Sequence, residues 1–356
     1  MIRPLLLGAL LGLGISALPA VADEPDANVL YNHHCAICHG VSRLGGIGPA
    51  LLPDNLSRLK PDEAFEVIHD GRIATQMPAY GELLDEAEIA ALAEWIFEAP
   101  EVEPSWTDED ILASHDVRHA YGTLPDEPVF EVEDLKNLFI VVEIGDHHVS
   151  LLDGDKFERI ARFPSRYALH GGPKYTPDGR YVYFGSRDGW VTKYDIYNLE
   201  VTAEVRAGIN MRNIAVSADG RYVLAGNYLP HTLVLLDARD LDLIATIPVE
   251  GLNGETSRVS AVYTAPPRNS FVAALRDIPE VWEIRWPEER ADGDETIVGD
   301  FALHRMEAPD YLDDFFFDME YRYLVGAARG GKGGQVFDMD EEVKVADLPL
   351  EGMPHL

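Results

Sequence analysis

The sequence has little cysteine and few basic residues. Cys35 and Cys38 are its only cysteines, too few for a cysteine-based zinc site, and if they hold a cofactor none is left for a disulfide. Lysine and arginine number 29 against 62 aspartates and glutamates, and the formal net charge is -33. Such a surface repels polyanions, which excludes nucleic acid and anionic membranes as partners. It suits a basic electron-transfer partner, or it is a solvated acidic surface tuned for solubility.

Long apolar stretches are absent after the first residues. Residues 5–18 form an apolar run behind Arg3, and Ala20-Val21-Ala22 supplies the small residues of a cleavage site. The run is too short for a comfortable transmembrane span. We therefore interpret residues 1–22 as a signal peptide that is removed on export to the periplasm, with an uncleaved anchor as the alternative. No later stretch of the sequence is long and apolar enough to span a bilayer.

The two cysteines belong to Cys35-Ala36-Ile37-Cys38-His39, which has the spacing of c-type heme attachment. The two thiols add to the two vinyl groups of one porphyrin, and the next residue then lies beneath the iron. His39 is therefore the expected proximal ligand of heme c. The alternative is a thioredoxin-like redox pair, but no βαβ pattern surrounds the motif. Covalent heme also fits export, because it is attached outside the cytoplasm.

Residues 23–105 carry the pattern of a small helical domain. The spacing predicts helices over residues 28–38, 62–68 and 83–97, the last with Asp85 as N-cap and Glu88 at capping-box distance. This order resembles the class I cytochrome c domain.

That family places its distal thioether ligand in a Met-Pro pair before the last helix, which implies Met77 as the sixth ligand. Met ligation would raise the potential and favour electron transfer. Alternatively, Met77 fills a gap in the core, and His69 is the more serious rival as ligand.

From residue 131 the residue pattern becomes that of short strands. The sequence DGRYV at residues 178–182 recurs at 219–223, with a weaker echo at 319–324. Asp153, Asp195 and Asp237 end strands about 40 residues apart, the size of a four-stranded propeller blade. We predict an all-β propeller over residues 131–356, with a solenoid or sandwich as alternatives, and a linker over 106–130. The length allows about five blades, so we expect an incomplete propeller from a truncated copy of a longer protein.

The order of a c-type domain and a propeller resembles the cytochrome cd1 family, which carries heme d1 on an eight-bladed propeller. Residues 167–170 (YALH) match the segment that supplies the proximal ligand of heme d1, which implies this role for His170. Segments around Arg187, Arg212 and Tyr228 match those that line the pocket, where arginines pair with the carboxylates of the macrocycle. Arg162 and Arg166 are further candidates because they lie close to His170 in sequence.

The resemblance departs from the nitrite-reducing members at the distal face, where two histidines deliver protons to nitrite. Residues 312–318 read LDDFFFD, so Asp313 replaces one histidine, whereas His355 keeps the other. This pattern resembles the dihydro-heme d1 dehydrogenase branch of the family. It implies an oxidoreductase that oxidises a propionate of its tetrapyrrole substrate, dihydro-heme d1, to an acrylate in heme d1 biosynthesis. His355 is the expected proton acceptor.

Electrons are expected to pass to heme c and then to an acceptor protein such as another c-type cytochrome. Nitrite reductase is the expected recipient of the finished heme d1. Two alternatives stay open at this point. One is a cytochrome cd1 nitrite reductase that forms NO. The other is a heme d1 carrier, or a plain electron-transfer cytochrome, that binds without turnover.

Overall fold

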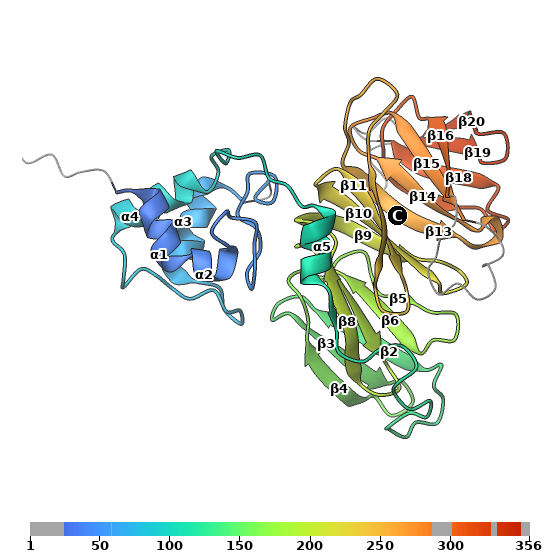
Figure 1. Ribbon diagram of the computed structural model, residues 1–356, viewed down its shortest axis with the longest axis horizontal. Helices are drawn as coiled ribbons and strands as arrows, with labels where there is room; N and C mark the ends of the chain where they lie inside the picture. Colours follow the sequence, from blue (N-terminus) through green and yellow to red (C-terminus); the bar gives the residue numbers. More distant parts are fainter. Residues whose placement is uncertain (1–24, 58, 287–300, 329–332, 350–356) are drawn as a thin grey trace, which may run out of the picture.

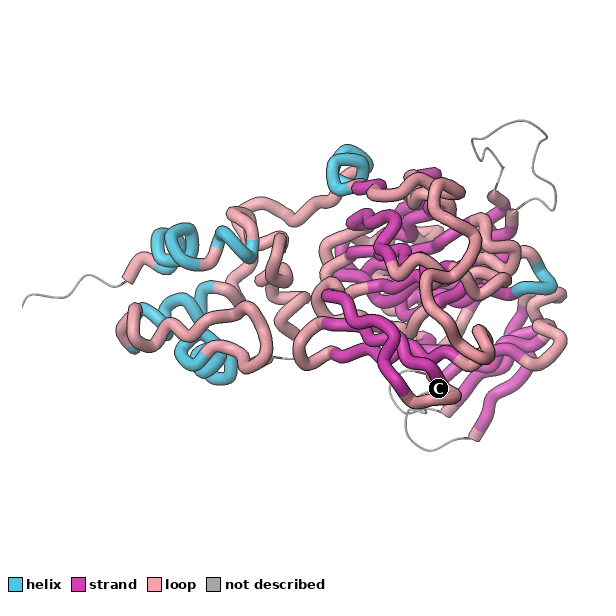
Figure 2. The backbone as a smooth tube through the Cα atoms, turned by 90° about the horizontal axis from the view of Figure 1, so that it is seen from below, coloured by secondary structure: helices cyan, strands magenta, loops and turns pink. Residues whose placement is uncertain are grey.

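The computed structural model describes residues 25–57, 59–286, 301–328 and 333–349. Helices gather in the N-terminal part, and strands make up the larger part (Figures 1 and 2). The expected class, an all-α cytochrome c domain followed by an all-β propeller, is confirmed. Within the described residues, no helix has the length and apolar character needed to cross a membrane. His355 and the proposed signal peptide lie outside them.

In the described residues, four helices form the first part: α1 (Ala27–His34), α2 (Ala36–His39), α3 (Pro61–Asp70) and α4 (Glu86–Trp95). Helix α4 begins with the predicted capping box, in which Asp85 accepts a hydrogen bond from the backbone of Glu88 and Glu88 bonds back to Asp85. This pairing satisfies two backbone donors that a helix start leaves open. The core between the helices is apolar and is built around Tyr31 and Ile89, both fully buried.

Residues 106–130, which we expected to be a linker, contain regular structure. Helix α5 (Asp108–Ser114) starts at Thr107, and strand β1 (Asp116–Val117) pairs with β8. In Figure 1, α5 lies where the helical part meets the strands. Ile111 of α5 is buried in the core of the second domain. This segment is therefore packed onto the propeller, a contact that its mixed sequence did not indicate.

The strands form five antiparallel sheets in the described residues, which agrees with the expected number of blades. The first is β2 (Leu138–Glu143), β3 (His148–Asp153) and β4 (Glu158–Pro164). The second holds β5 (Lys174–Tyr175), β6 (Tyr181–Gly185), β7 (Trp190–Asp195) and β8 (Glu200–Arg206), with β1 at its edge. The third holds β9 (Asn210–Val216), β10 (Tyr222–Leu229), β11 (Thr232–Asp237) and β12 (Leu243–Pro248).

The fourth sheet holds β13 (Val259–Ala265), β14 (Ser270–Leu275), β15 (Glu280–Arg285) and β16 (Ala302–Glu307). The fifth holds β17 (Leu312–Phe317), β18 (Tyr323–Ala328), β19 (Gly334–Asp338) and β20 (Val343–Leu348). A short 3-10 helix, η1 (Pro266–Arg268), joins β13 to β14. Strands β5, β9, β13 and β17 follow one another as neighbours, so the second to fifth sheets meet along these strands; β5, β9 and β13 are labelled in Figure 1.

The repeated DGRYV sequence forms the turn before the second strand of a blade. Asp219 accepts hydrogen bonds from the Ser217 hydroxyl at 2.6 Å and from the backbone of Arg221 at 3.0 Å. Gly220 has a φ of 72°, a left-handed conformation that glycine adopts without strain. Asp178 makes the same backbone bond to Arg180 in the preceding blade. The repeat is therefore a turn signal rather than a site.

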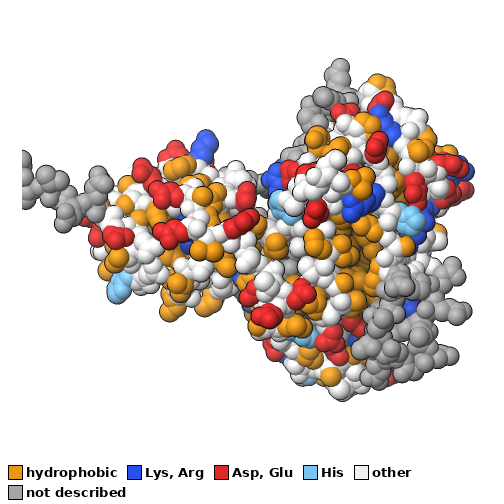
Figure 3. All heavy atoms as spheres, turned by 45° about the horizontal axis from the view of Figure 1, so that its top comes forward, with side chains coloured by type: hydrophobic (Ala, Val, Ile, Leu, Met, Phe, Trp, Pro, Cys, Tyr) orange, Lys and Arg blue, Asp and Glu red, His pale blue; other side chains and the backbone are white. Residues whose placement is uncertain are grey.

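Acidic side chains are spread over the helical part on the face drawn in Figure 3, with few basic ones among them. In the propeller, by contrast, many arginines pair with carboxylates of the chain itself. Arg180 bonds to Asp195 at 3.0 Å and Arg322 to Asp338 at 2.8 Å, and each of these aspartates ends a strand. Asp195 and Asp338 therefore serve as partners of arginines within the blades.

Candidate functional site

The proposed heme c site lies where α1 meets α2. Cys35 ends α1 and begins α2, and both cysteines are free and half-buried. His39 is the last residue of α2, and its Nδ1 lies 2.8 Å from the Pro49 carbonyl oxygen. Nδ1 therefore carries the proton, which leaves the lone pair of Nε2 for a metal. Burial lowers the pKa of His39, so the ring is held in the neutral form that ligation requires.

The loop after His39 approaches the ring closely. A Cβ on Gly48 would lie 2.8 Å from the imidazole, so only glycine lets the backbone pass there. Apolar side chains around the motif are exposed in the polypeptide: Ile37 is 83% exposed and Ile73, in the loop before Met77, is 98% exposed. A flat, apolar porphyrin joined to Cys35 and Cys38 would cover such surface. The residues present therefore fit a covalent heme.

Met77 is half-buried and packs against the helical core. Its carbonyl oxygen accepts a hydrogen bond from the backbone of Arg72 at 3.1 Å, which closes the loop that presents it. The rival His69 lies on the surface of α3, where its Nδ1 bonds to Asp70 at 2.7 Å. The Asp70 carboxylate raises the pKa of His69, so a proton competes more strongly with a metal for this ring. This arrangement favours Met77 over His69.

The second proposed site is centred on His170, which precedes β5. Its Nδ1 lies 2.8 Å from the carbonyl oxygen of Arg212, so this nitrogen is the donor. Its Nε2 lies 2.9 Å from Nη1 of the same arginine and must accept that hydrogen bond. Arg212 is held in turn by the Ser260 carbonyl, 2.7 Å from Nε. The lone pair that would bind an iron is therefore oriented and is capped by a guanidinium.

Arg187 and Tyr228, which the sequence analysis proposed for one pocket, lie close together. The Arg187 guanidinium lies 5.5 Å from the centre of the Tyr228 ring. Two arginines that the sequence analysis missed share that ring: Arg258 at 5.7 Å and Arg276 at 5.2 Å. Nη1 of Arg276 also donates to the Tyr228 hydroxyl at 3.1 Å. Arg258 also bonds to Asp277 at 2.6 Å and Arg276 lies 3.4 Å from Asp313, so two of the three guanidinium groups face carboxylates of the chain. An anionic ligand would compete with these carboxylates for the arginines.

The inner strands add further polar groups that sequence reasoning missed. Tyr263 of β13 donates to the buried Asp314 of β17 at 2.9 Å. Burial lowers the pKa of Lys174 on β5, and the nearby Asp314 partly opposes that shift. These residues are far apart in sequence, and the succession of first strands brings them together. A signal was visible in β17, where two aspartates precede three phenylalanines.

Arg162 is not part of this cluster, which corrects our expectation. It lies on β4, is exposed, and forms ion pairs with Glu143 and Asp146. Its neighbour Arg166 stacks on Trp190 at 3.7 Å and bonds to Glu204 at 2.8 Å. Sequence proximity to His170 failed as an argument because alternate residues of a strand, and the turn after it, point to different sides.

His355 lies outside the described residues. Asp313, which stands at the place of the other distal histidine, can be located. It lies on β17, with its carboxylate 3.4 Å from Nη1 of Arg276. Because Arg276 also bonds to Tyr228, Asp313 belongs to the same group of side chains as the arginines.

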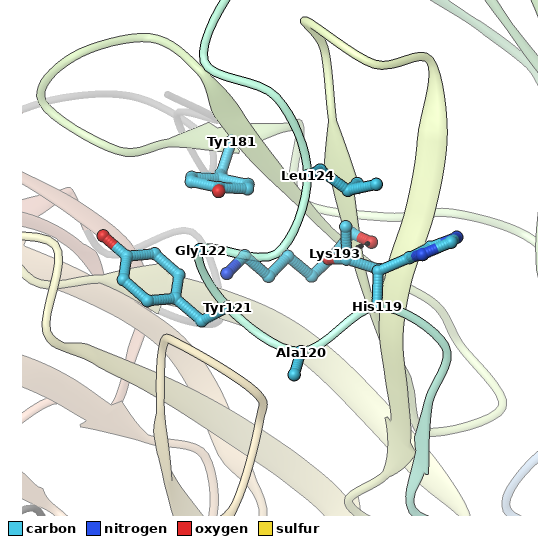
Figure 4. A pocket seen from close by; sticks show the side chains of 8 residues that line it. His119, Ala120, Tyr121, Gly122, Leu124, Tyr181 and Lys193 are labelled. Atoms are coloured by element: carbon cyan, nitrogen blue, oxygen red, sulfur yellow. Dashed lines mark hydrogen bonds between the residues drawn. The ribbon is translucent and has the colours of Figure 1, made fainter.

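A pocket beside α5 has a different character. Lys193 extends between the rings of Tyr121 and Tyr181, with its Nζ 4.9 Å and 4.0 Å from their centres (Figure 4). Nζ also bonds to the Arg239 carbonyl at 2.5 Å. The lysine fills the space, which leaves no room for a water molecule. We therefore regard this cluster as part of the packing of the segment after α5 and not as a ligand site.

A helical domain with a heme attachment motif, joined to a propeller with a histidine and clustered arginines, defines a protein with two tetrapyrrole centres. Residues 133–356 match the cytochrome D1 heme domain, and residues 22–96 match cytochrome C oxidase, cbb3-type, subunit III. The chain therefore belongs to the cytochrome D1 heme domain family, as its sequence led us to expect.

Among its relatives, dihydro-heme d1 dehydrogenase of Pseudomonas aeruginosa is 58% identical over 99% of this chain and 69% of its own length. Nitrite reductase of Stutzerimonas stutzeri is 26% identical over 99% of this chain and 67% of its own length. The solved structure of dihydro-heme d1 dehydrogenase NirN in complex with DHE has a TM-score of 0.85 and 58% identity. That similarity covers 93% of this chain and 68% of the solved one.

Proposed function

We propose that this protein is a dihydro-heme d1 dehydrogenase that converts a propionate of its substrate to an acrylate and passes the electrons to heme c. One observation carries the proposal: an oriented histidine and a cluster of arginines lie in a propeller that is packed against a c-type heme domain. The 58% identical dehydrogenase supports it. The reaction takes a CH2–CH2 unit to CH=CH, which releases two electrons and two protons.

The propeller residues bind and orient the substrate. A guanidinium fork binds a carboxylate with two parallel hydrogen bonds, so Arg187 and Arg212 are suited to the side-chain carboxylates of dihydro-heme d1. His170 offers Nε2 to the iron of the substrate, because its other nitrogen is occupied by the Arg212 carbonyl. Arg212 caps Nε2 and must move aside as the substrate enters. A carboxylate of the substrate can then take over its guanidinium.

The helical domain would hold heme c through Cys35 and Cys38, with His39 and Met77 as ligands of its iron. When bound there, heme c would supply one-electron transfer, so two transfers would be needed for each acrylate. The Pro49 carbonyl keeps the His39 ring in one orientation through both transfers. We propose an acceptor protein, such as a c-type cytochrome with a basic face, that removes each electron from the acidic helical part.

The protons require acceptors beside the propionate. We propose His355 as the first acceptor, since a neutral imidazole takes up protons near neutral pH. Asp313, whose carboxylate faces Arg276, is a second candidate. We place the protein in the periplasm and propose nitrite reductase as the recipient of its product.

The test is a stoichiometric conversion with a supplied electron acceptor. Purified protein with oxidised heme c is mixed with dihydro-heme d1 without oxygen, and the spectra of substrate and heme c are followed together. We expect acrylate formation with reduction of two equivalents of a supplied acceptor per product. His355→Ala should bind the substrate without converting it. Arg162→Gln, which changes an arginine outside the cluster, should behave like the parent.

The alternative functions give different outcomes. Nitrite reduction to NO by the protein loaded with heme d1 would replace the proposal by a nitrite reductase, a function favoured by the 26% identical relative. Tight binding of dihydro-heme d1 without conversion by the parent protein would favour a carrier.

A further inference from the structure

Arg206 connects the two proposed sites and is not explained by either alone. It ends β8, is 4% exposed, and lies at the junction of the helical domain and the propeller. Among the residues that the structure describes, its side chain forms no ion pair with a carboxylate; it bonds to backbone carbonyls from both domains. A buried guanidinium directed at main-chain oxygens fixes the position of the segments that carry them.

The first contact of Arg206 is with the pocket. Its Nε donates to the backbone oxygen of Asp188 at 2.9 Å. Asp188 directly follows Arg187, whose guanidinium lies over Tyr228. The carbonyl of Arg187 in turn accepts a hydrogen bond from the backbone of Met211 at 3.2 Å. Arg206 therefore holds the turn that presents one of the arginines of the tetrapyrrole pocket.

The second contact is with the heme c loop. Nη2 of Arg206 donates to the backbone oxygen of Leu44 at 2.5 Å. The next residue, Gly45, has a φ of 86°, and a Cβ there would lie 3.0 Å from Nη2, so the loop approaches the guanidinium without a side chain between them. The backbone of Gly45 donates to the carbonyl of His39 at 2.9 Å. The same loop ends at Pro49, which holds Nδ1 of His39.

Buried side chains surround the two carbonyl contacts of Arg206 and shield them from water. The Arg206 guanidinium lies 4.5 Å from the centre of the Trp106 ring, and Trp106 Nε1 donates to the backbone oxygen of Arg206 at 2.8 Å. Beside it, Ala50 and Leu52 of the heme domain pack against Ile209 of the propeller, and all three are at most 1% exposed. Water cannot replace the two carbonyl bonds there, so a shift of one loop is transmitted to the other.

We infer that Arg206 is a positioning residue that couples occupancy of the tetrapyrrole pocket to the axial histidine of heme c. The inference rests on the proposed function only in that both sites hold tetrapyrroles. A ligand that draws Arg187 toward its carboxylate pulls on the Asp188 carbonyl and, through Arg206, on the loop that holds His39. The hydrogen bond at Nδ1 sets the basicity of the axial ligand and thereby its preference for oxidised or reduced iron.

Thermodynamic linkage makes this coupling measurable from either side. If ligand binding changes the potential of heme c, then oxidised and reduced heme c must bind the ligand with different affinities. A tenfold affinity ratio corresponds to about 59 mV for a one-electron couple. The probe is heme d1 with zinc in place of iron, because zinc takes a histidine ligand and does not change oxidation state.

The experiment titrates this probe into protein with heme c held oxidised or reduced, and measures the heme c potential with and without it. For the parent, we expect affinities that differ at least threefold between the two states. For Arg206→Gln, we expect equal affinities within error and a mean affinity within threefold of the parent. Arg206→Lys keeps the charge but cannot reach both carbonyls, so its ratio should also approach one.

Arg43→Gln is the matched control. Arg43 is equally buried and precedes Leu44, but its guanidinium bonds to carbonyls of Trp95, Ile96 and Glu98 within the heme domain. This variant should shift the heme c potential by the same amount with and without the probe, so the affinity ratio remains. A ratio unchanged in both Arg206 variants, or a parent ratio of one, overturns the inference. A coupled parent that fails to desaturate dihydro-heme d1 overturns the proposed function alone.

Discussion

Replacing the pocket arginines one at a time should weaken tetrapyrrole binding to different extents. Arg187 lies over Tyr228 at 5.5 Å, and its proposed partner is a carboxylate of the ligand. Hydrogen bonds to charged groups contribute about 1.5–3 kcal/mol. At about 1.4 kcal/mol per factor of ten, Arg187→Gln should bind dihydro-heme d1 about 10- to 150-fold more weakly than the parent.

Arg212 is subject to two opposing effects. Its loss removes the same kind of carboxylate partner, but it also removes the hydrogen bond of 2.9 Å that caps His170 Nε2 and must break on binding. Releasing that bond returns about 0.5–1.5 kcal/mol. The loss of the carboxylate partner is the larger effect at the middle of the two ranges, where the net weakening is about 1.25 kcal/mol, or about eightfold. The His170 tautomer survives in Arg212→Gln, because the backbone oxygen is retained.

Binding is measured by titrating dihydro-heme d1 into each variant with heme c kept reduced, so that no turnover intervenes. Arg162→Gln serves as the control, since Arg162 pairs only with Glu143 and Asp146 in the contacts that the structure describes. We expect Arg187→Gln to have the largest dissociation constant, followed by Arg212→Gln. The dissociation constant of Arg162→Gln should equal that of the parent. Equal weakening by all three would mean that net charge, and not the cluster, holds the ligand.

The remaining predictions concern the heme ligand and the fold. Met77→Ala should lower the heme c potential and remove the thioether-to-iron absorption band, whereas His69→Ala should leave both unchanged; the reverse result would make His69 the ligand. Burial lowers the pKa of Lys193 to about 8, whereas a lysine in the unfolded chain titrates near about 10.4. The unfolded chain therefore binds more protons between these pH values, so the free energy of unfolding should rise with pH across this interval. Lys193→Met should remove that rise in denaturant titrations, and an unchanged slope would refute the assignment.

The sequence predicted the parts of the fold that depend on local signals. The capping box at Asp85 and the turns at Asp178 and Asp219 each use hydrogen bonds between residues close in the chain, and the attachment motif at Cys35 depends on the spacing of five consecutive residues. Such signals can be read from a single sequence because the partners lie within a few positions of each other. The period of about 40 residues between strand-ending aspartates then indicated the blades.

The pocket depended on contacts that no local pattern records. Arg258 and Arg276 lie at the ends of strands in the fourth sheet, and they reach Tyr228 of the third only because the two sheets are neighbours. The prediction that Arg162 belongs to the pocket was wrong for the converse reason. Its guanidinium pairs with Glu143, a carboxylate in its own sheet. The sequence analysis did not single out Arg206, because its partners are main-chain oxygens and such partners leave no pattern of residue types.

Asp313 would have different roles in the two candidate reactions, because one consumes protons and the other releases them. Nitrite reduction to NO consumes two protons, so it needs donors at the distal face. Desaturation of a propionate releases two protons, so it needs acceptors, and an ionised carboxylate can accept a proton. Asp313 lies 3.4 Å from Arg276, within the arginine cluster around Tyr228.

Asp313→Asn keeps the shape of the side chain and removes its capacity to accept a proton. A positioned general base contributes about a hundredfold or more, and since His355 shares the task, we expect conversion of dihydro-heme d1 to fall at least tenfold. The affinity for the substrate should stay within threefold of the parent. If conversion is unchanged, Asp313 only anchors Arg276, and His355 must receive both protons.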